Sequence, residues 1–228
     1  MTKCLDANRI PTEWTDANVI LLFKKGEKED LRNYRPISLL SALYKLFTKI
    51  ITNRITDQLD SNQPAEQAGF RSNYSTNDHL QVVQQIMERC NEYAQPLCMA
   101  FIDYEKAFDS VSTSSVLNAL ISQNINKTYV ETLKFIYSNA TSTFKLHNNS
   151  NKVPIRRGVR QGDTISPKLF TAVLEGIFKN LNWEDKGINI NGRRSTHLRF
   201  ADDIIVLPSN QQQLQKMMAD LNRASKKV

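Results

Sequence analysis

The spacing of apolar residues along the chain predicts several amphipathic helices. In the longest of these patterns, Leu43, Leu46, Phe47, Ile50 and Ile51 recur three and four residues apart, which is the spacing of one helix face. A second pattern, around residues 80–90, predicts a helix that begins at Asn77 or Asp78, because short polar side chains favour helix starts. The predicted helices cover residues 41–59, 80–90, 113–123 and 128–139, a segment that opens at Ser166-Pro167, and a last segment that starts near Gln211.

Short apolar runs between turn-forming residues predict the strands. Residues 19–23 have the composition of a buried strand, and another apolar run begins at residue 97 and ends in Asp103. Residues 196–200 and 204–207 predict two short strands on either side of a tight turn. Two further hairpins are predicted, one with its turn at residues 148–151 between strands at 143–147 and 152–159, and one with its turn at Asn191-Gly192.

The order of these elements favours the α+β class. Helices and strands mix without the strict alternation that builds a doubly wound parallel sheet, so we expect an antiparallel sheet with helices packed on one face. The chain contains no internal repeat, no low-complexity tract and no linker-like stretch. Residues 1–228 are therefore expected to form one continuous domain.

Composition places the chain among ordinary globular proteins. Its 228 residues are 40% hydrophobic and 23% charged, which is enough apolar material to build a core without metals or disulfides. The longest apolar run, residues 19–23, is far shorter than the ~18 residues of a membrane span, and the N-terminus lacks the apolar segment of a signal peptide. We therefore expect a soluble intracellular protein with no membrane partner. The three cysteines have no spacing typical of a zinc site.

The charge distribution points to a polyanionic partner. The formal net charge is +7, and the basic residues gather in three clusters rather than being spread evenly. These clusters comprise Lys24, Lys25, Lys28, Arg32 and Arg35, then Arg156, Arg157 and Arg160, and then Arg193 and Arg194. Clusters of this kind favour nucleic acid as the partner.

Three aspartates are the strongest candidates for chemistry. Asp103 ends an apolar run, and Asp202 and Asp203 stand in a turn whose flanks, residues 200–205, are too apolar for an ordinary exposed loop. If the strands that carry them are neighbours, the three carboxylates converge. Such a cluster is electrostatically unfavourable without cations, and oxygen ligands select Mg²⁺ or Mn²⁺. Two such cations held together can activate a hydroxyl and stabilise a leaving phosphate.

Several motifs resemble those of reverse transcriptases from LINE-type, non-LTR retrotransposons. Residues 101–109 (FIDYEKAFD) resemble motif A of that family, residues 158–167 (GVRQGDTISP) resemble motif B, and residues 200–203 (FADD) resemble motif C. Upstream, residues 24–26, 33–39 and 67–71 match the motifs on the fingers side in the expected order. The resemblance spans essentially the whole chain.

This resemblance implies a fold and an activity. The fold would be the fingers and palm of a right-hand polymerase, and the activity would be RNA-directed addition of dNTPs to the 3′-OH of a DNA primer on an RNA template. Asp103 and Asp202 would bridge two Mg²⁺ ions, with Mn²⁺ as an alternative, and Asp203 would assist them. The backbone carbonyl of Tyr104 would complete the metal ligands.

The resemblance also assigns residues that bind the nucleotide and the nucleic acid. Lys24 or Lys25 and Arg35 would hold the triphosphate, and the Phe108 ring would lie beneath the sugar and exclude a 2′-OH. Gln161 and Gly162 would line the nucleotide pocket. The basic residues expected to contact template phosphates are Arg71, Arg156, Arg157 and Arg160.

Two alternatives stay open at this point. The sequence ends before the motif D, primer grip and thumb of the family, and nothing upstream of Ile10 resembles an endonuclease. We therefore expect a fingers and palm portion without a thumb. A second hypothesis is a truncated, inactive polymerase-derived fragment that at most binds nucleic acid or a protein partner. An RNA-dependent RNA polymerase is disfavoured by Phe108 and by the FADD sequence.

Overall fold

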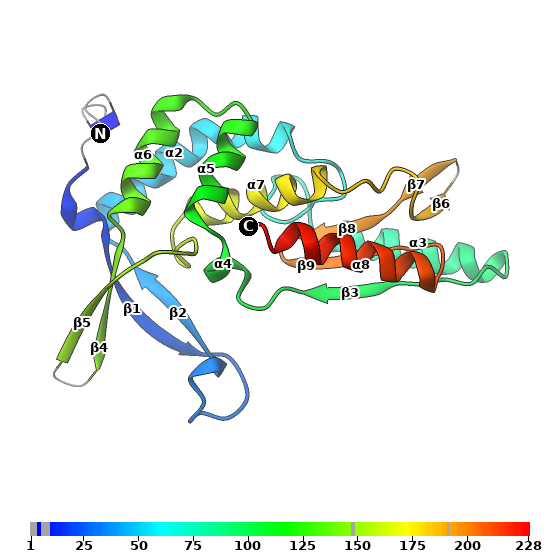
Figure 1. Ribbon diagram of the computed structural model, residues 1–228, viewed down its shortest axis with the longest axis horizontal. Coiled ribbons are helices and arrows are strands. Elements are labelled where there is room, and N and C mark those ends of the chain that lie inside the picture. The colour runs from blue at the N-terminus through cyan, green and yellow to red at the C-terminus, as the bar shows by residue number, and fades with distance from the viewer. Residues whose placement is uncertain (1–3, 6–9, 147–148, 191) are drawn as a thin grey trace. The chain divides into compact units, whose positions relative to one another are not determined.

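The computed structural model describes residues 4–5, 10–146, 149–190 and 192–228 and divides the chain into two compact units (Figure 1). The first unit comprises Met1–Leu59 and Phe108–Phe170, and the second comprises Asp60–Ala107 and Thr171–Val228. Each unit is therefore built from two separate stretches of chain. None of the described helices is long and apolar enough to cross a membrane.

The first unit contains a four-stranded sheet in the order β2-β1-β4-β5. Its strands are β1 (Asp16–Phe23), β2 (Tyr34–Leu39), β4 (Thr141–Leu146) and β5 (Asn149–Pro154). β1 pairs antiparallel with β2 and parallel with β4, and β4 pairs antiparallel with β5. β5 therefore begins at Asn149, inside the predicted turn at residues 148–151, and residues 147 and 148 lie outside the described part of the chain.

The prediction that residues 19–23 form a buried strand is wrong about burial. They are a strand, but Leu21 and Leu22 are 45% and 56% exposed. The reason is the position of the hairpin, because β1 and β2 project away from the helices of the first unit (Figure 1). Apolar composition had indicated burial, but burial depends on what packs against the strand.

The helices of the first unit are α2 (Ala42–Ser61), α5 (Thr113–Ser122) and α6 (Lys127–Ser138), with the short helices η1 (Thr12–Trp14), η2 (Leu31–Asn33) and α4 (Ala107–Ser110). The three longer helices confirm the periodicity. In α2, however, Tyr44, Phe47 and Ile51 are buried, whereas Leu43 and Leu46 are 60% and 52% exposed. The buried face is therefore rotated from the predicted one.

The second unit contains a three-stranded antiparallel sheet in the order β3-β9-β8. Its strands are β3 (Ala100–Asp103), β9 (Asp203–Val206) and β8 (His197–Phe200), and a two-stranded hairpin is formed by β6 (Ile188–Ile190) and β7 (Arg193–Ser195). Asn191 of the predicted Asn191-Gly192 turn lies outside the described residues. The helices are α3 (Thr76–Glu92), the second half of α7 (Ser166–Lys179) and α8 (Gln211–Ser225).

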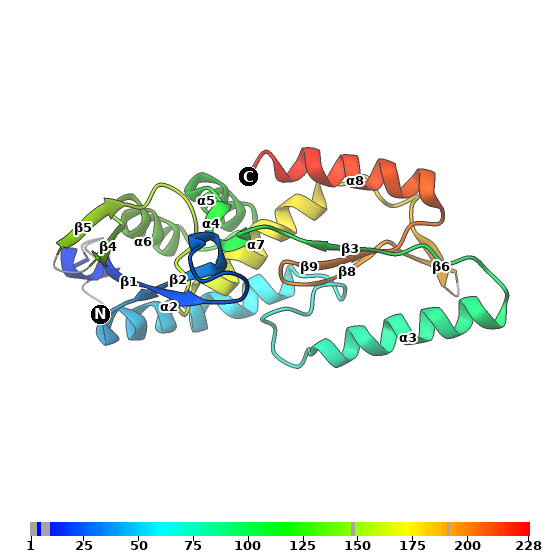
Figure 2. The same ribbon diagram turned by 90° about the horizontal axis from the view of Figure 1, so that it is seen from below.

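Helices cover both faces of this sheet rather than the one face expected. Leu198 packs with Ile86 of α3, whereas its neighbours His197 and Arg199 contact α7 through Phe178. Because alternate residues of a strand point to opposite faces, α3 and α7 lie on opposite sides. Figure 2 shows α3 and α8 on either side of β3, β8 and β9.

The start of α3 also differs from the expectation. The residue that precedes the helix is Ser75, not Asn77 or Asp78. The Asp78 carboxylate accepts a hydrogen bond of 2.7 Å from the Ser75 backbone N–H, so Asp78 closes the first turn as the partner in a capping box.

Candidate active site

The three predicted aspartates meet at one end of the β3-β9-β8 sheet. Asp103 is the last residue of β3 and pairs in register with Asp203, the first residue of β9. Asp202 precedes Asp203 in the two-residue turn that follows Phe200, since Phe200 and Asp203 are themselves a register pair. The predicted neighbourhood of these strands is confirmed.

Like charges face each other at this end of the sheet. Side chains of directly opposed residues have Cβ atoms ~4.5–5.5 Å apart, and like charges in such a pair are destabilising. Asp103 and Asp203 are both exposed to solvent, and Asp202 is half-buried. No group of three His, Cys, Asp or Glu side chains within metal-binding distance occurs among the described residues. The oxygen-only donors nevertheless fit Mg²⁺, which is usually held by one or two carboxylates together with water and substrate phosphates.

The Tyr104 side chain is engaged elsewhere in the second unit. Its hydroxyl lies 2.7 Å from the Ser225 hydroxyl of α8, and burial raises the pKa of the phenol. A role beside Asp103 would therefore fall to the main-chain carbonyl of Tyr104, as the resemblance implies, and this stays a prediction.

In the first unit, the loop of residues 158–163 contains Gln161 and Gly162, which are candidates for the nucleotide pocket, and it is hydrogen-bonded to β2 and to Asp109. The Ser38 N–H of β2 donates to the Gln161 carbonyl at 2.8 Å, and the Gln161 side-chain amide donates to Asp109 at 3.0 Å. Gly162 has a φ of +102°, and a Cβ at this position would lie 2.8 Å from the Ser38 carbonyl oxygen. This close approach requires glycine.

The same loop fixes the segment that carries Phe108. The Val159 N–H donates to the Phe108 carbonyl at 2.8 Å. The Phe108 ring is half-buried and stacks on Phe170 of α7, with ring centroids 4.5 Å apart. The stack fixes the orientation of the ring, which a ring that excludes a 2′-OH requires. The same stack is also an ordinary core contact between two aromatic residues.

The three predicted phosphate-binding cations of the first unit lie on one hairpin. Arg35 pairs in register with Leu22, and Lys24 directly follows β1. The Lys24 N–H donates to the Asn33 carbonyl at 2.9 Å, which closes the hairpin end. Lys24, Lys25 and Arg35 are all exposed, so their charges are accessible to an anionic ligand.

Two of the four arginines expected to contact the template serve the protein instead. Arg160 is only 3% exposed, and its guanidinium donates to the Thr15 carbonyl, so the prediction that it contacts template phosphates is wrong in this conformation. Arg71 is half-buried and donates to three backbone carbonyls of its own unit. Arg156 and Arg157 are exposed and remain candidates.

Sequence reasoning missed a buried polar cluster beneath the motif B loop. The Asp163 carboxylate, 4% exposed, accepts hydrogen bonds from the Tyr44 hydroxyl at 2.7 Å and from the Thr48 hydroxyl at 2.9 Å. Burial raises the pKa of the Asp163 carboxyl. The cluster ties the loop to α2, and its only signal in the sequence was Asp163 itself within the motif B match.

An ion pair behind the motif C turn was also missed. The Arg199 guanidinium donates to the Glu175 carboxylate of α7 at 2.7 Å, and both side chains are almost fully buried. Burial lowers the pKa of Arg199, and the Glu175 charge opposes that effect. The pair anchors β8 to α7, two residues before Ala201.

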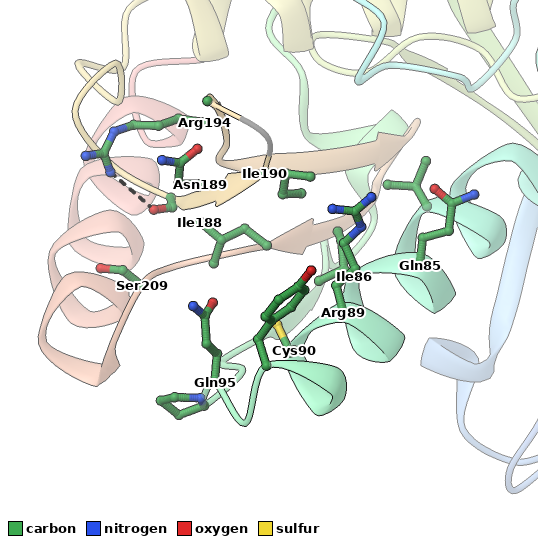
Figure 3. A pocket seen from close by; sticks show the side chains of 15 residues that line it. Gln85, Ile86, Arg89, Cys90, Gln95, Ile188, Asn189, Ile190, Arg194 and Ser209 are labelled. Carbon is green, nitrogen blue, oxygen red and sulfur yellow. Dashed lines mark hydrogen bonds between the residues drawn. The ribbon is translucent and has the colours of Figure 1, made fainter.

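The second unit also contains a cavity of about 740 Å³ between α3 and the β6–β7 hairpin (Figure 3). Ile86 and Cys90 line it from α3, and Ile188 and Ile190 line it from β6. Arg89 and Arg194 contribute positive charge at its walls. None of the predicted site residues belongs to its lining.

Comparison with known proteins identifies a matching family and several relatives of this chain. The family model "Reverse transcriptase (RNA-dependent DNA polymerase)" matches residues 24–228. A Pol polyprotein of the type-1 retrotransposable element R2 from Popillia japonica is 33% identical over 204 residues, which cover 88% of this chain and 28% of the relative. A probable RNA-directed DNA polymerase from transposon BS of Drosophila melanogaster is 28% identical, covering 88% of this chain and 22% of the relative. The chain thus spans less than a third of these relatives.

Solved structures support the fold. The apo telomerase from Candida tropicalis truncated from its C-terminal domain superposes with a TM-score of 0.66 at 14% identity, covering 93% of this chain and 47% of that chain. The predicted right-hand polymerase fold is thereby confirmed. The chain belongs to the reverse transcriptase (RNA-dependent DNA polymerase) family, as a domain of the LINE-type, non-LTR branch that its motifs predicted.

Proposed function

We propose that this chain forms the fingers and palm of an RNA-directed DNA polymerase that adds dNTPs to the 3′-OH of a DNA primer on an RNA template. The observation that carries the proposal is the register pair of Asp103 and Asp203, with Asp202 in the adjoining turn. The family description and the names of the relatives support the reaction. We further propose that the protein acts inside the cell, where an RNA template and dNTPs are available.

The carboxylates of Asp103, Asp202 and Asp203, with the carbonyl of Tyr104, would hold two Mg²⁺ ions, or Mn²⁺. Cations bound there supply the positive charge that activates the primer hydroxyl and stabilises the leaving pyrophosphate. The protein's own contribution is to hold Asp103 and Asp203 at a fixed separation, since each is a residue of a paired strand. The sheet thereby fixes the acidic positions before substrate arrives.

The first unit supplies residues for the nucleotide and the template. Lys24, Lys25 and Arg35 bind the triphosphate, and the guanidinium of Arg35 matches phosphate in a forked geometry. Phe108 excludes a 2′-OH, and Gln161 and Gly162 line the nucleotide pocket. Template phosphates are contacted by the exposed Arg156 and Arg157.

Primer extension tests this proposal. The chain is incubated with a DNA primer on an RNA template, with dNTPs or NTPs, in Mg²⁺ or in EDTA. Asp202→Asn is compared with Asp57→Asn, which removes an exposed carboxylate on α2. We expect extension with dNTPs that vanishes in EDTA and in Asp202→Asn and persists in Asp57→Asn. Extension that survives EDTA or Asp202→Asn would refute the metal-dependent mechanism. Binding to the RNA–DNA hybrid without extension would favour the inactive fragment.

A further inference from the structure

Residues 66–68 of the second unit lie along β8, next to the turn that contains Asp202. The Arg199 N–H donates to the Glu66 carbonyl at 2.7 Å, and the Ala68 N–H donates to the Arg199 carbonyl at 2.9 Å. Gln67 and Arg199 accordingly form an isolated parallel bridge. Residues 66–68 thus extend the edge of the β3-β9-β8 sheet beyond β8.

The side chain of Gln67 reaches from this segment into the turn. It is 0% exposed, and its Oε1 atom accepts two backbone hydrogen bonds, one from the Gly69 N–H at 2.8 Å and one from the Ala201 N–H at 3.1 Å. Ala201 is the first residue of the two-residue turn and immediately precedes Asp202. One oxygen atom therefore joins residues 67–69 to the backbone that presents a catalytic aspartate.

The turn needs such support because its backbone is strained. Ala201 has a φ of +56°, a left-handed conformation that glycine adopts easily and that costs an L-residue free energy. Conformations of this kind persist where the surroundings over-determine them. Gly69 provides part of that constraint, because a Cβ built there would lie only 2.3 Å from the Ala201 nitrogen.

Gln67 is a poor choice if stability alone is considered. Its Nε2 atom is buried and has no hydrogen-bond partner among the described residues. A buried donor without a partner destabilises the folded state. Gln67 therefore lowers the stability of the fold through its Nε2 atom, while its Oε1 atom provides the acceptor for the Ala201 N–H.

Arg71 holds the segment that carries Gln67. Its Nη1 donates to the carbonyls of Pro64 at 2.6 Å and Gln67 at 3.0 Å, and its guanidinium stacks on the Tyr74 ring at 4.2 Å. Arg71, which the sequence suggested as a contact for template phosphates, thus holds residues 64–67 in place.

We propose that Gln67 is a positioning residue of the polymerase site, which holds the Ala201 backbone and thereby sets the place of the Asp202 carboxylate. The part of this proposal that concerns cations rests on the proposed function, whereas the part that concerns the turn does not. Residues that orient metal ligands from behind typically change metal affinity or activity 10–100-fold when replaced.

The first measurement is amide hydrogen exchange without metal. Gln67→Met keeps the length of the side chain and removes the acceptor. Gln63→Met is the matched control, because Gln63 is also buried in this unit but its side-chain amide donates to the Thr171 carbonyl of α7. We expect the Ala201 amide to exchange at least ~10-fold faster in Gln67→Met than in the wild type and unchanged in Gln63→Met.

The second measurement is Mn²⁺ affinity by electron paramagnetic resonance, together with primer extension. We expect Gln67→Met to bind Mn²⁺ ~10-fold more weakly than the wild type. Its kcat should fall while its KM for dNTP stays unchanged, and Gln63→Met should match the wild type in all three quantities. Unchanged Ala201 exchange would overturn the proposal. Faster exchange with wild-type Mn²⁺ affinity would also overturn it, because the turn would then not position the ligand.

Gly69→Ala tests the same point without touching Gln67. The φ of Gly69 lies outside the left-handed region, so alanine is strained there through its close contacts with the backbone of Phe200 and Ala201. Gly176→Ala is the control, since its added Cβ meets nothing within 4 Å. We expect faster Ala201 exchange and weaker Mn²⁺ binding in Gly69→Ala alone, and wild-type values would overturn the proposal. If the wild type neither binds Mn²⁺ nor extends primers, the proposed function fails, while the exchange data still decide whether Gln67 holds the turn.

Discussion

His197 should make the second unit sensitive to acid. Its ring packs against Phe178 and Trp183, with centroids 4.4 Å and 5.9 Å away, and its Nε2 is buried without a partner among the described residues. Burial, aided by the nearby charge of Arg199, lowers the pKa of His197 from 6.5 to about 3. The folded protein therefore holds this imidazole neutral at pH values where the unfolded chain protonates it.

The sign and size of the effect follow from proton linkage. Because the pKa is lower in the folded state, stability is complete above pH 6.5 and falls as the pH decreases towards 3. A pH of 5 lies 1.5 units below the pKa of 6.5 that the imidazole has in the unfolded chain. Protonation of the unfolded chain therefore lowers the free energy of unfolding at pH 5 by about 2 kcal/mol, at about 1.36 kcal/mol per pH unit. With a urea m-value of about 2 kcal/mol/M, the unfolding midpoint should move by about 1 M.

His197→Phe isolates this contribution. Phenylalanine fits an aromatic environment, loses the 2.7 Å contact with the Thr196 hydroxyl, and cannot be protonated. Urea unfolding is measured at pH 7 and pH 5 for both proteins, and the loss between the two values should be about 2 kcal/mol smaller in the variant. Other groups titrate equally in both proteins and cancel in the comparison. Equal losses in the two proteins would refute the low pKa of His197.

Two further predictions concern the ion pair and the sugar gate. Glu175→Ala leaves Arg199 charged and buried, so it should cost about 3–5 kcal/mol in urea unfolding, whereas Glu175→Leu combined with Arg199→Met should restore most of that stability. A double variant as unstable as the single one would contradict this account. Phe108→Ala should lower the preference for dNTPs over NTPs in kcat/KM by about 10-fold or more, because the ring no longer excludes a 2′-OH. If the Phe108→Ala variant is folded and shows a cooperative thermal transition, an unchanged ratio of kcat/KM for dNTPs over NTPs would reject Phe108 as the residue that excludes the 2′-OH.

Much of this architecture could be predicted from local pattern. The helices at 41–59, 113–123 and 128–139 follow from apolar spacing, which is a property of neighbouring turns and needs no partner. The sequence also placed Asp103, Asp202 and Asp203 as a converging set on the condition that their strands are neighbours, and the pairing of β3 with β9 meets that condition. What local pattern determined was therefore the order of the elements and the place of the acidic residues.

Tertiary structure alone decided which side chains are buried and what they contact. Leu22 is apolar yet exposed, because β1 projects from its unit, and Arg160 is charged yet buried, because it finds the carbonyl of Thr15, 145 residues away. Gln67 likewise accepts a hydrogen bond from the Ala201 N–H, 134 residues further along the chain. Burial and hydrogen bonding depend on segments that are distant in sequence, so periodicity, which compares only neighbours, carries no information about them.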